Sequence, residues 1–167
     1  MKSLGNKKWL IEHIRRSAEL AAVLEVSGWL KPGNVHRTRD HSDSQFEHFL
    51  AGLIVLGSIE AAAFRGIIVA KGRLSPSKVG VGRLIKMAVE DVMSSHNSGN
   101  THLGTCLLFI LISVAAAKTH VERGCFQITS FEENFGAIMR STTSNSAIDV
   151  YEAIVMASSP HEMGRAG

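Results

Sequence analysis

The residues with the clearest chemical potential lie in a polar segment between positions 31 and 43. The segment reads Lys31, Pro32, Gly33, Asn34, Val35, His36, Arg37, Thr38, Arg39, Asp40, His41, Ser42 and Asp43. Lysine and arginine neutralise phosphate, glycine and asparagine let backbone amides turn toward an anion, and aspartate can accept a proton or hold a metal ion. This mixture suits a phosphate-binding loop with acid–base groups beside it. A solvated loop whose charges pair with one another fits the composition equally well.

A second polar segment, residues 98–105, precedes the most apolar stretch of the chain. It reads Ser98, Gly99, Asn100, Thr101, His102, Leu103, Gly104 and Thr105. The start of a helix there would offer unpaired backbone amides and the positive end of the helix dipole to an anion, and the glycines would let a ligand approach the backbone. A simpler interpretation is that Asn100 or Thr101 caps the helix. The two interpretations are compatible.

Several histidines near these segments raise the question of a metal site: His36, His41, His96 and His102. Their spacings match no standard zinc motif, so we do not expect a histidine-based metal centre. The two cysteines, Cys106 and Cys125, form neither a disulfide framework nor a metal-ligand spacing and are expected to be plain thiols.

Composition and charge indicate one cytoplasmic globular domain. The chain is 45% hydrophobic, and its net charge of +3 comes from 18 basic and 15 acidic residues. This modest excess, without a basic block or an aromatic recognition face, favours anionic ligands without predicting nucleic-acid binding. The longest apolar run, Leu103 to Ala117, is shorter than the ~20 residues that span a bilayer and is interrupted by Ser113. Met1 to Arg16 lacks the apolar core of a signal peptide.

Helical periodicity predicts the elements that must position the two segments. The expected helices cover residues 9–26, 44–66, 83–93 and about 101–117, with two more that begin at Ser130 and Ser146. Capping boxes support three of these starts, and they pair Ser44 with Glu47, Ser130 with Glu133, and Ser146 with Asp149. Residues 66–82 are expected to be a connector, although residues 67–70 could pack on the core.

The expected fold class is all-α. A helix without a polar face belongs in the centre of a bundle, and the helix over about residues 101–117 fits that description. No segment shows strand-type alternation, which favours a multi-helix bundle around this central apolar helix. We expect the two polar segments to approach each other across it.

At these segments the sequence resembles the triphosphoribosyl-dephospho-CoA synthase family. Residues 31–37, followed by Asp40, Asp43 and residues 46–51, resemble its first signature. Residues 100–104, Asn-Thr-His-Leu-Gly, resemble a second signature that opens an apolar helix. The later stretch with residues 151–154, 157–160 and Gly164 is also similar, so the resemblance spans most of residues 18–164.

The resemblance implies an all-α transferase that takes the 5-triphosphoribosyl group from ATP, releases adenine and joins the group to the 2′-hydroxyl of 3′-dephospho-CoA. Breaking the N-glycosidic bond leaves an oxocarbenium-like centre beside a highly charged triphosphate. Cations and amides must therefore hold the triphosphate, and a carboxylate must face the sugar.

On this basis we predict the roles of individual residues. The predicted substrate-binding residues are Lys31, Gly33, Asn34, His36, Arg37, Arg39, Gly99, Asn100, Thr101, His102 and Gly104. The predicted catalytic residues are Asp40, Asp43 and Glu47. Asp40 and Asp43 are also candidate ligands of Mg²⁺, and either could instead be the general base.

Two departures from the family pattern shape these expectations. Position 103 is Leu where the citrate-lyase branch usually has lysine, so the chain is more similar to the archaeal and general bacterial branch. The family's chains are also longer, with a second helical half. Residues 1–167 are therefore expected to be a single helical domain equivalent to the N-terminal portion, and a poor catalyst alone. A non-catalytic nucleotide- or CoA-binding piece, a homo-oligomer, or a partner that supplies the other half stays open.

Overall fold

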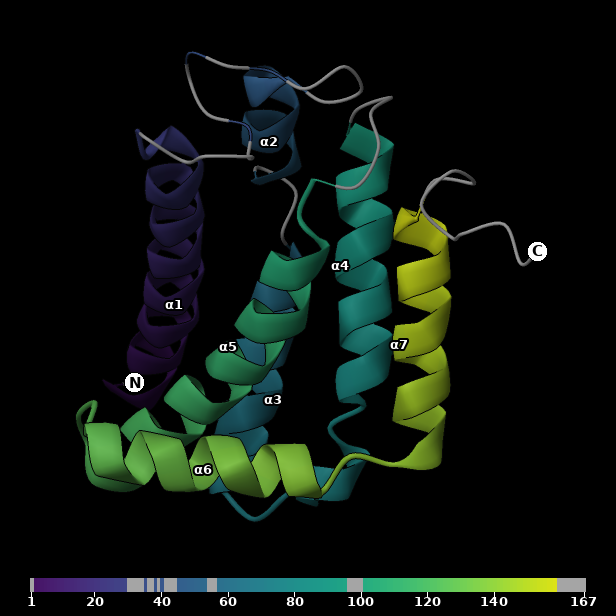
Figure 1. Ribbon diagram of the computed structural model, residues 1–167. Coiled ribbons are helices and arrows are strands. Elements are labelled where there is room, and N and C mark those ends of the chain that lie inside the picture. The colour runs from purple at the N-terminus through teal and green to yellow at the C-terminus, as the bar shows by residue number, and fades with distance from the viewer. Residues whose placement is uncertain are drawn as a thin grey trace.

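The computed structural model describes residues 2–29, 35, 38, 40, 45–53, 57–95 and 101–158, and every regular element within these ranges is helical (Figure 1). The elements are α1 (Lys2–Ser27), α2 (Phe46–Leu53), α3 (Gly57–Ala70), a 3₁₀ turn (Pro76–Lys78), α4 (Val81–Ser95), α5 (Leu103–Arg123), α6 (Ile128–Arg140) and α7 (Ser144–Ala157). The all-α prediction is confirmed.

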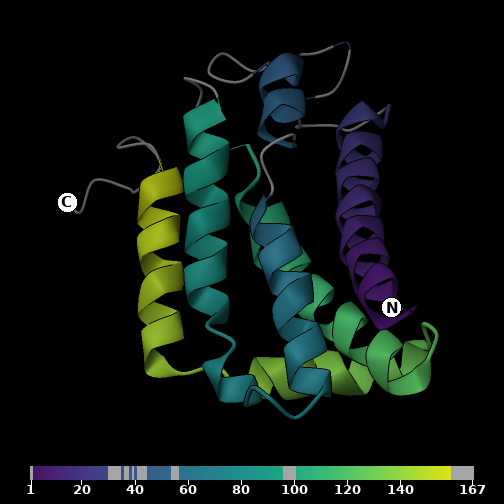
Figure 2. The same ribbon diagram turned by 180° about the vertical axis from the view of Figure 1, so that it is seen from behind.

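The long helices run along the molecule, and two shorter ones close its ends. Figures 1 and 2 show α4 and α7 side by side, α6 lying across one end, and the short α2 at the other end between α1 and α4. The helix α5 runs obliquely through this frame and packs against α1, α3, α4, α6 and α7. The predicted central helix is therefore confirmed.

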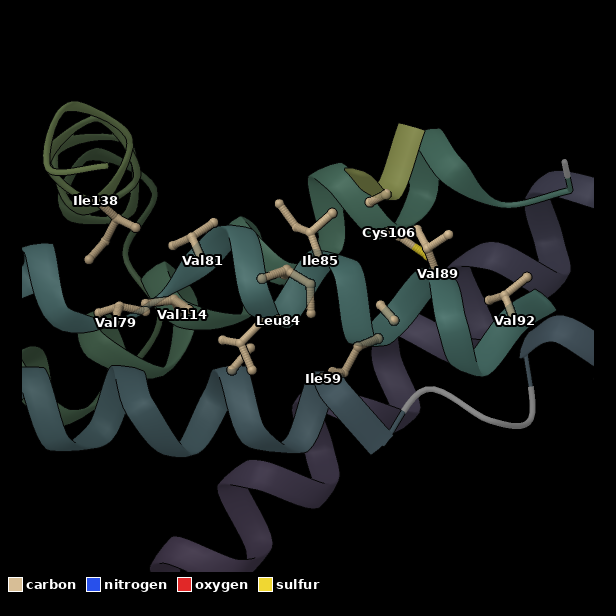
Figure 3. Close-up of a cluster of buried hydrophobic side chains, with 14 of the residues drawn as sticks. Ile59, Val79, Val81, Leu84, Ile85, Val89, Val92, Cys106, Val114 and Ile138 are labelled. Carbon is tan, nitrogen blue, oxygen red and sulfur yellow. The ribbon is translucent and has the colours of Figure 1, made fainter. Parts of the chain in front are cut away.

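The core lies where α3, α4 and α5 meet (Figure 3). Ile59 of α3, Leu84 of α4 and Val114 of α5 are each no more than 1% exposed. Ile138 joins them from α6, which explains how the crosswise helix is held. The burial of these aliphatic groups is the main force that fixes the helices relative to one another.

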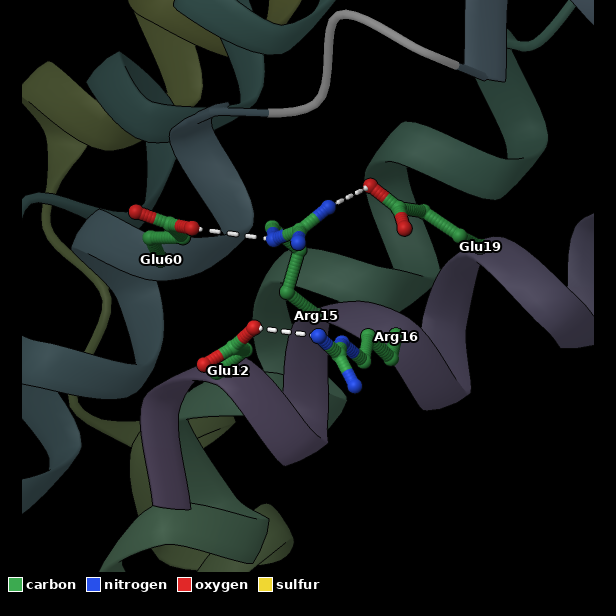
Figure 4. Close-up of polar contacts among 5 residues, drawn as sticks. All are labelled: Glu12, Arg15, Arg16, Glu19 and Glu60. Atoms are coloured by element: carbon green, nitrogen blue, oxygen red, sulfur yellow. Dashed lines mark hydrogen bonds and ion pairs between the residues drawn. The ribbon is translucent and has the colours of Figure 1, made fainter. Parts of the chain in front are cut away.

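An ion-pair cluster supplements this core where α1 packs on α3 (Figure 4). Arg15 Nε on α1 lies 2.9 Å from Glu60 Oε1 on α3, and Arg15 also pairs with Glu19. Along α1, Arg16 Nη2 lies 2.6 Å from Glu12 Oε1. The Glu19 carboxylate raises the pKa of Arg15 through a hydrogen bond, and Glu60 adds to the effect.

The prediction of one helix over residues 44–66 is wrong. Two helices occupy this region, since α2 ends at Leu53 and α3 begins at Gly57. The helix α3 also continues past Gly66 to Ala70, with Ile67 and Val69 buried. Residues 67–70 are therefore part of a core helix and not of a connector.

Two of the predicted capping boxes are also wrong. Ser130 lies inside α6 and is buried, because that helix begins two residues earlier, at Ile128. Thr143 caps α7, where its Oγ1 accepts a hydrogen bond from the backbone N–H of Ser146 at 3.3 Å. Ser44 lies outside the described residues.

By length and composition, α5 is long and apolar enough to cross a membrane. A core helix meets the same criterion. Five helices pack against α5, and Ser113 and Thr119 are among its most buried residues, which accords with a place in the core. Leu108 and Ile112 are exposed, so the neighbouring helices do not enclose α5 on every side.

Candidate active site

The described elements beside the two polar segments meet at one end of the bundle. The segment 31–43 precedes α2, and residues 101 and 102 of the second segment lead into α5. At this end α2 packs against both α1 and α4, and Figure 1 shows it above the N-terminus of α5. The end is therefore built from elements that are far apart in the sequence.

A direct hydrogen bond joins the second segment to α2. His102 Nε2 lies 2.6 Å from the carbonyl oxygen of Phe49, and the two rings meet edge to face with centroids 5.2 Å apart. Because a carbonyl only accepts, Nε2 must carry the hydrogen. The bond joins the second segment to the helix that follows the first segment, and the approach of the two segments themselves stays a prediction.

The packing around His102 is tight. The imidazole is 4% exposed, and a Cβ on Gly52 of α2 would lie 2.8 Å from His102 Cδ2. The same Cβ would lie 3.2 Å from Val92 Cγ1 on α4. Only glycine at position 52 lets α2 sit this close to both α4 and the start of α5.

The start of α2 is held by side chains that come from both directions along the chain. Asp40 Oδ1 accepts a hydrogen bond from the Phe46 N–H at 3.0 Å, and His48 Nδ1 accepts one from the Gln45 N–H at 3.1 Å. These bonds satisfy amides that have no partner within the helix. Glu47, the predicted partner of Ser44, is exposed.

The role of His48 was not predicted. A side chain three residues after the helix boundary that reaches back to its N–H is the geometry of a capping box. In this chain a histidine at position 48 does what a glutamate or glutamine usually does. The sequence feature that could have indicated this hydrogen bond is the three-residue spacing between Gln45 and His48.

At the start of α5 the N-cap residue is His102, not Asn100 or Thr101, and its side chain makes no cap hydrogen bond. The imidazole bonds to Phe49 instead. Gly104 in the first turn is exposed, and no atom of the described residues lies within 4 Å of where its Cβ would be. None of the described residues therefore blocks a ligand from approaching the backbone at this turn.

The predicted site residues divide into two groups. The structure describes the first group: Asp40, Glu47 and Gly104 are exposed, Thr101 is half-buried, and His102 is buried. The others lie outside the described residues: Lys31, Gly33, Asn34, His36, Arg37, Arg39, Asp43, Gly99 and Asn100. Val35, within the first segment, is 2% exposed.

Burial perturbs two titratable groups in the α4–α5 contact. Burial and the neighbouring Glu90 raise the pKa of Asp91. Burial also raises the pKa of the Cys106 thiol to about 12, and the Asp91 charge adds to the effect. Asp91, in the last part of α4, is a carboxylate to which the sequence pattern assigned no role.

The described residues offer little for a metal ion. Within the described part of the chain, no group of three or more His, Cys, Asp or Glu side chains gathers. Asp40 is the one predicted metal ligand that the structure describes, and its Oδ1 is engaged with α2. The described donor set therefore does not make a magnesium site on its own.

Comparison with known proteins identifies the family. No curated protein and no solved structure matches the chain. One family profile does match, that of CitG, described as ATP:dephospho-CoA triphosphoribosyl transferase, over residues 11–162. This range contains both polar segments and α2 through α7. The chain therefore belongs to the ATP:dephospho-CoA triphosphoribosyl transferase family, and it is a transferase that acts on ATP and dephospho-CoA.

Proposed function

We propose that this chain transfers the 5-triphosphoribosyl group at the end of the bundle where α2 meets the start of α5. The observation that supports this placement is the hydrogen bond between His102 of the second segment and Phe49 of α2, the helix that follows the first segment. Two anion-binding devices, a cationic loop and a helix N-terminus, would then face one substrate.

In this proposal the first segment holds the triphosphate. Lys31, Arg37 and Arg39 neutralise the phosphates, the backbone amides of Gly33 and Asn34 donate to them, and His36 adds a donor. The second segment binds the other end of the nucleotide, through Gly99, Asn100, Thr101 and the open first turn at Gly104. The charge on a triphosphate makes such a concentration of cations necessary, because burying phosphate without them is costly.

The acceptor must lose a proton as it attacks. The 2′-hydroxyl oxygen of dephospho-CoA forms a bond to C1′ of the ATP ribose, the N-glycosidic bond breaks, and adenine leaves with the electron pair and takes up a proton. A carboxylate removes the hydroxyl proton and faces the positive charge that develops on the sugar. We propose Asp40 or Asp43 for this task, with Glu47, near the start of α2, as the second candidate.

Mg²⁺ at Asp40 and Asp43 is a further proposal. A magnesium ion bound to a triphosphate usually takes only one or two protein carboxylates and keeps several waters. Bound in this way, it would neutralise part of the triphosphate charge. The described residues do not by themselves form its site, so no step above depends on it.

The location, the branch of the family and the oligomeric state are also proposals. We propose a cytoplasmic location, with no nucleic-acid or membrane partner, because ATP and dephospho-CoA are water-soluble nucleotides. Leu103 supports a place in the archaeal and general bacterial branch, in which the final acceptor is a related nucleotide or dephospho-CoA itself. A homo-oligomer or a second helical portion would then complete the site.

The direct test is release of adenine from ATP by the purified protein with dephospho-CoA present. We expect slow release, since a second helical portion would complete the site; the release should depend on both substrates and give a product whose mass equals dephospho-CoA plus the triphosphoribosyl group. The Arg37→Ala variant should lose this activity, whereas Arg140→Ala, a change of the same kind on the distant α6, should keep it. Release of inorganic phosphate or pyrophosphate in place of adenine would contradict the proposal.

A further inference from the structure

We propose that His102 is a positioning residue that holds α2 against the start of α5 through its Nε2–H, and that it does not bind substrate. The kinetic part of this inference rests on the proposed function, because it assumes that the site lies at this end of the bundle. The structural part stands on its own contacts.

The geometry around the imidazole carries the inference. Nε2 already donates to the Phe49 carbonyl at 2.6 Å, so it has no hydrogen left for a phosphate or a hydroxyl. The ring is 4% exposed and meets the Phe49 ring edge to face. Gly52 lies beside the ring, so close that a Cβ at this position would come within 2.8 Å of Cδ2. A buried ring fixed on these sides is placed to connect helices.

The helix α2, which His102 contacts, is too short to be stable without contacts to other elements. An isolated helix of fewer than ~12 residues is marginal in water, and α2 covers only Phe46–Leu53. Its position therefore depends on contacts with other elements, and the His102 bond joins it to a residue 53 positions further along the chain. The packing of α2 against α4 adds a second support.

A shift of α2 would displace Asp40 in the first polar segment. Asp40 bonds to the first amide of α2, so movement of the helix moves that carboxylate with it. Misplacement of a reacting group by about 1 Å can cost about a hundredfold in rate. Loss of the His102 bond should therefore lower the turnover number much more than it weakens the binding of ATP.

Two amide substitutions separate positioning from substrate binding. In His102→Gln the side-chain nitrogen falls near the place of Nε2, whereas in His102→Asn it falls near the place of Nδ1. If His102 positions α2, Gln should keep most of the turnover number, and Asn should lower it at least about tenfold with little change in KM for ATP. If Nδ1 binds substrate, Asn should be the better variant and KM should rise in Gln, which would overturn the proposal.

A glycine pair tests the same contact from the side of α2. Gly52→Ala places a methyl group against the His102 ring and should lower turnover as His102→Asn does. Gly57→Ala is the matched control, because no atom of the described residues lies within 4 Å of a Cβ at that position. Equal turnover in the two alanine variants would contradict the positioning role.

Nuclear magnetic resonance of the parent protein tests the inference without any activity. With ¹³C and ¹⁵N labelling, the His102 ring signals can be assigned through bonds in the parent itself, and they should show a proton on Nε2 that exchanges slowly with solvent. A proton on Nδ1 alone, or fast exchange at Nε2, would overturn the proposal even if every variant unfolds. If the parent releases no adenine but shows the protected Nε2–H, the proposed function fails and the contact stands.

Discussion

Gly66 of α3 lies directly against the backbone carbonyl of Val114 on α5, in the middle of the core. A Cβ at position 66 would overlap that carbonyl and would also meet the Ala117 methyl group at 3.0 Å. The obstacle is largely backbone, which cannot turn away as a flexible side chain can. The glycine therefore sets how closely these two helices approach.

We predict that Gly66→Ala lowers the free energy of unfolding by about 1–3 kcal/mol, the usual cost of overpacking a core. The gain in helix propensity, up to about 1 kcal/mol, offsets only part of this cost. Urea unfolding followed by circular dichroism measures the difference between the variant and the parent.

Gly136→Ala in α6 is the matched control, because a Cβ there would meet only the flexible end of the Arg140 side chain. That variant should be as stable as the parent or more stable by up to about 1 kcal/mol. A loss of stability as large as that in Gly66→Ala would show that helix geometry, not the contact with Val114, sets the cost.

The two cysteines should react at very different rates. Only the thiolate is nucleophilic, and burial raises the pKa of Cys106 to about 12, whereas Cys125 is exposed. At pH 8 in the native protein, iodoacetamide should modify Cys125 and leave Cys106 intact. Mass spectrometry of the parent and of Cys125→Ser checks this. Fast modification of native Cys125→Ser would mean that the α4–α5 contact opens readily.

A polar network between α5 and α6 should make stability depend on pH. Lys118 Nζ donates to Glu122 Oε1 at 2.7 Å and to Asn134 Oδ1 at 2.5 Å, and Asn134 Nδ2 donates to Glu122 Oε2 at 3.0 Å. Burial alone would raise the pKa of Glu122, but the hydrogen bonds from Lys118 and Asn134 outweigh it and lower the pKa below 4.5.

The folded-state pKa of Glu122 is thus below that of the unfolded chain. The carboxylate then stabilises the fold fully above the unfolded value and loses this effect as the pH falls through the folded value. We expect Glu122→Gln to cost about 1 kcal/mol at pH 7, a modest figure because solvent screens the partly exposed pair. The difference between variant and parent should shrink below about pH 4. A difference that stays constant with pH would exclude the charge as its source.

Much of the fold could be predicted because helical periodicity carries the information. The apolar stretch after residue 102 forms the central helix, since a segment without a polar face can be satisfied only inside a bundle. The division between α2 and α3 was missed, because the residues on both sides continue the same apolar period. Ser130 was mistaken for a cap because the sequence pattern of a capping box can also occur inside a helix.

For the candidate site, the sequence indicates residue types and not their arrangement. The residue types of the two segments predict an anion-binding site, which stays a prediction, and the elements beside them meet at one end of the bundle. The sequence does not reveal that the His102 side chain points inward, because this orientation depends on Gly52, which lies in a helix far from His102 along the chain. The perturbed pKa of Asp91 likewise arises from burial that only the packing creates.

Binding of ATP should depend on the cations of the first segment. We expect Lys31→Ala or Arg37→Ala to weaken ATP binding by about 1.5–3 kcal/mol, the scale of a hydrogen bond to a charged group. Adenosine should bind less tightly than ATP, and the affinity for ATP should fall as salt rises. Isothermal titration calorimetry measures all three effects. If ATP and adenosine bind equally, the first segment is a connector and the phosphate assignment is wrong.

The two aspartates of the first segment should behave differently when their charge is removed. Asn at position 40 can still accept the hydrogen bond from Phe46, whereas Ala cannot, so only Asp40→Ala should loosen the start of α2. We expect Asp40→Ala to lower stability by about 1 kcal/mol and Asp40→Asn to lower it much less. Thermal melting of the two variants separates the capping role from any chemical one.

Turnover then identifies the base. If Asp40 takes the proton of the 2′-hydroxyl, Asp40→Asn should fold and bind ATP as the parent does and yet lose turnover by at least about a hundredfold. If Asp43 is the base, Asp43→Asn shows that loss, and a magnesium ligand would instead reveal itself by a raised requirement for Mg²⁺. Assays of adenine release over a range of Mg²⁺ concentrations distinguish these cases. If both asparagine variants keep full turnover at every Mg²⁺ concentration, neither aspartate acts in the reaction, and Glu47 becomes the residue to replace.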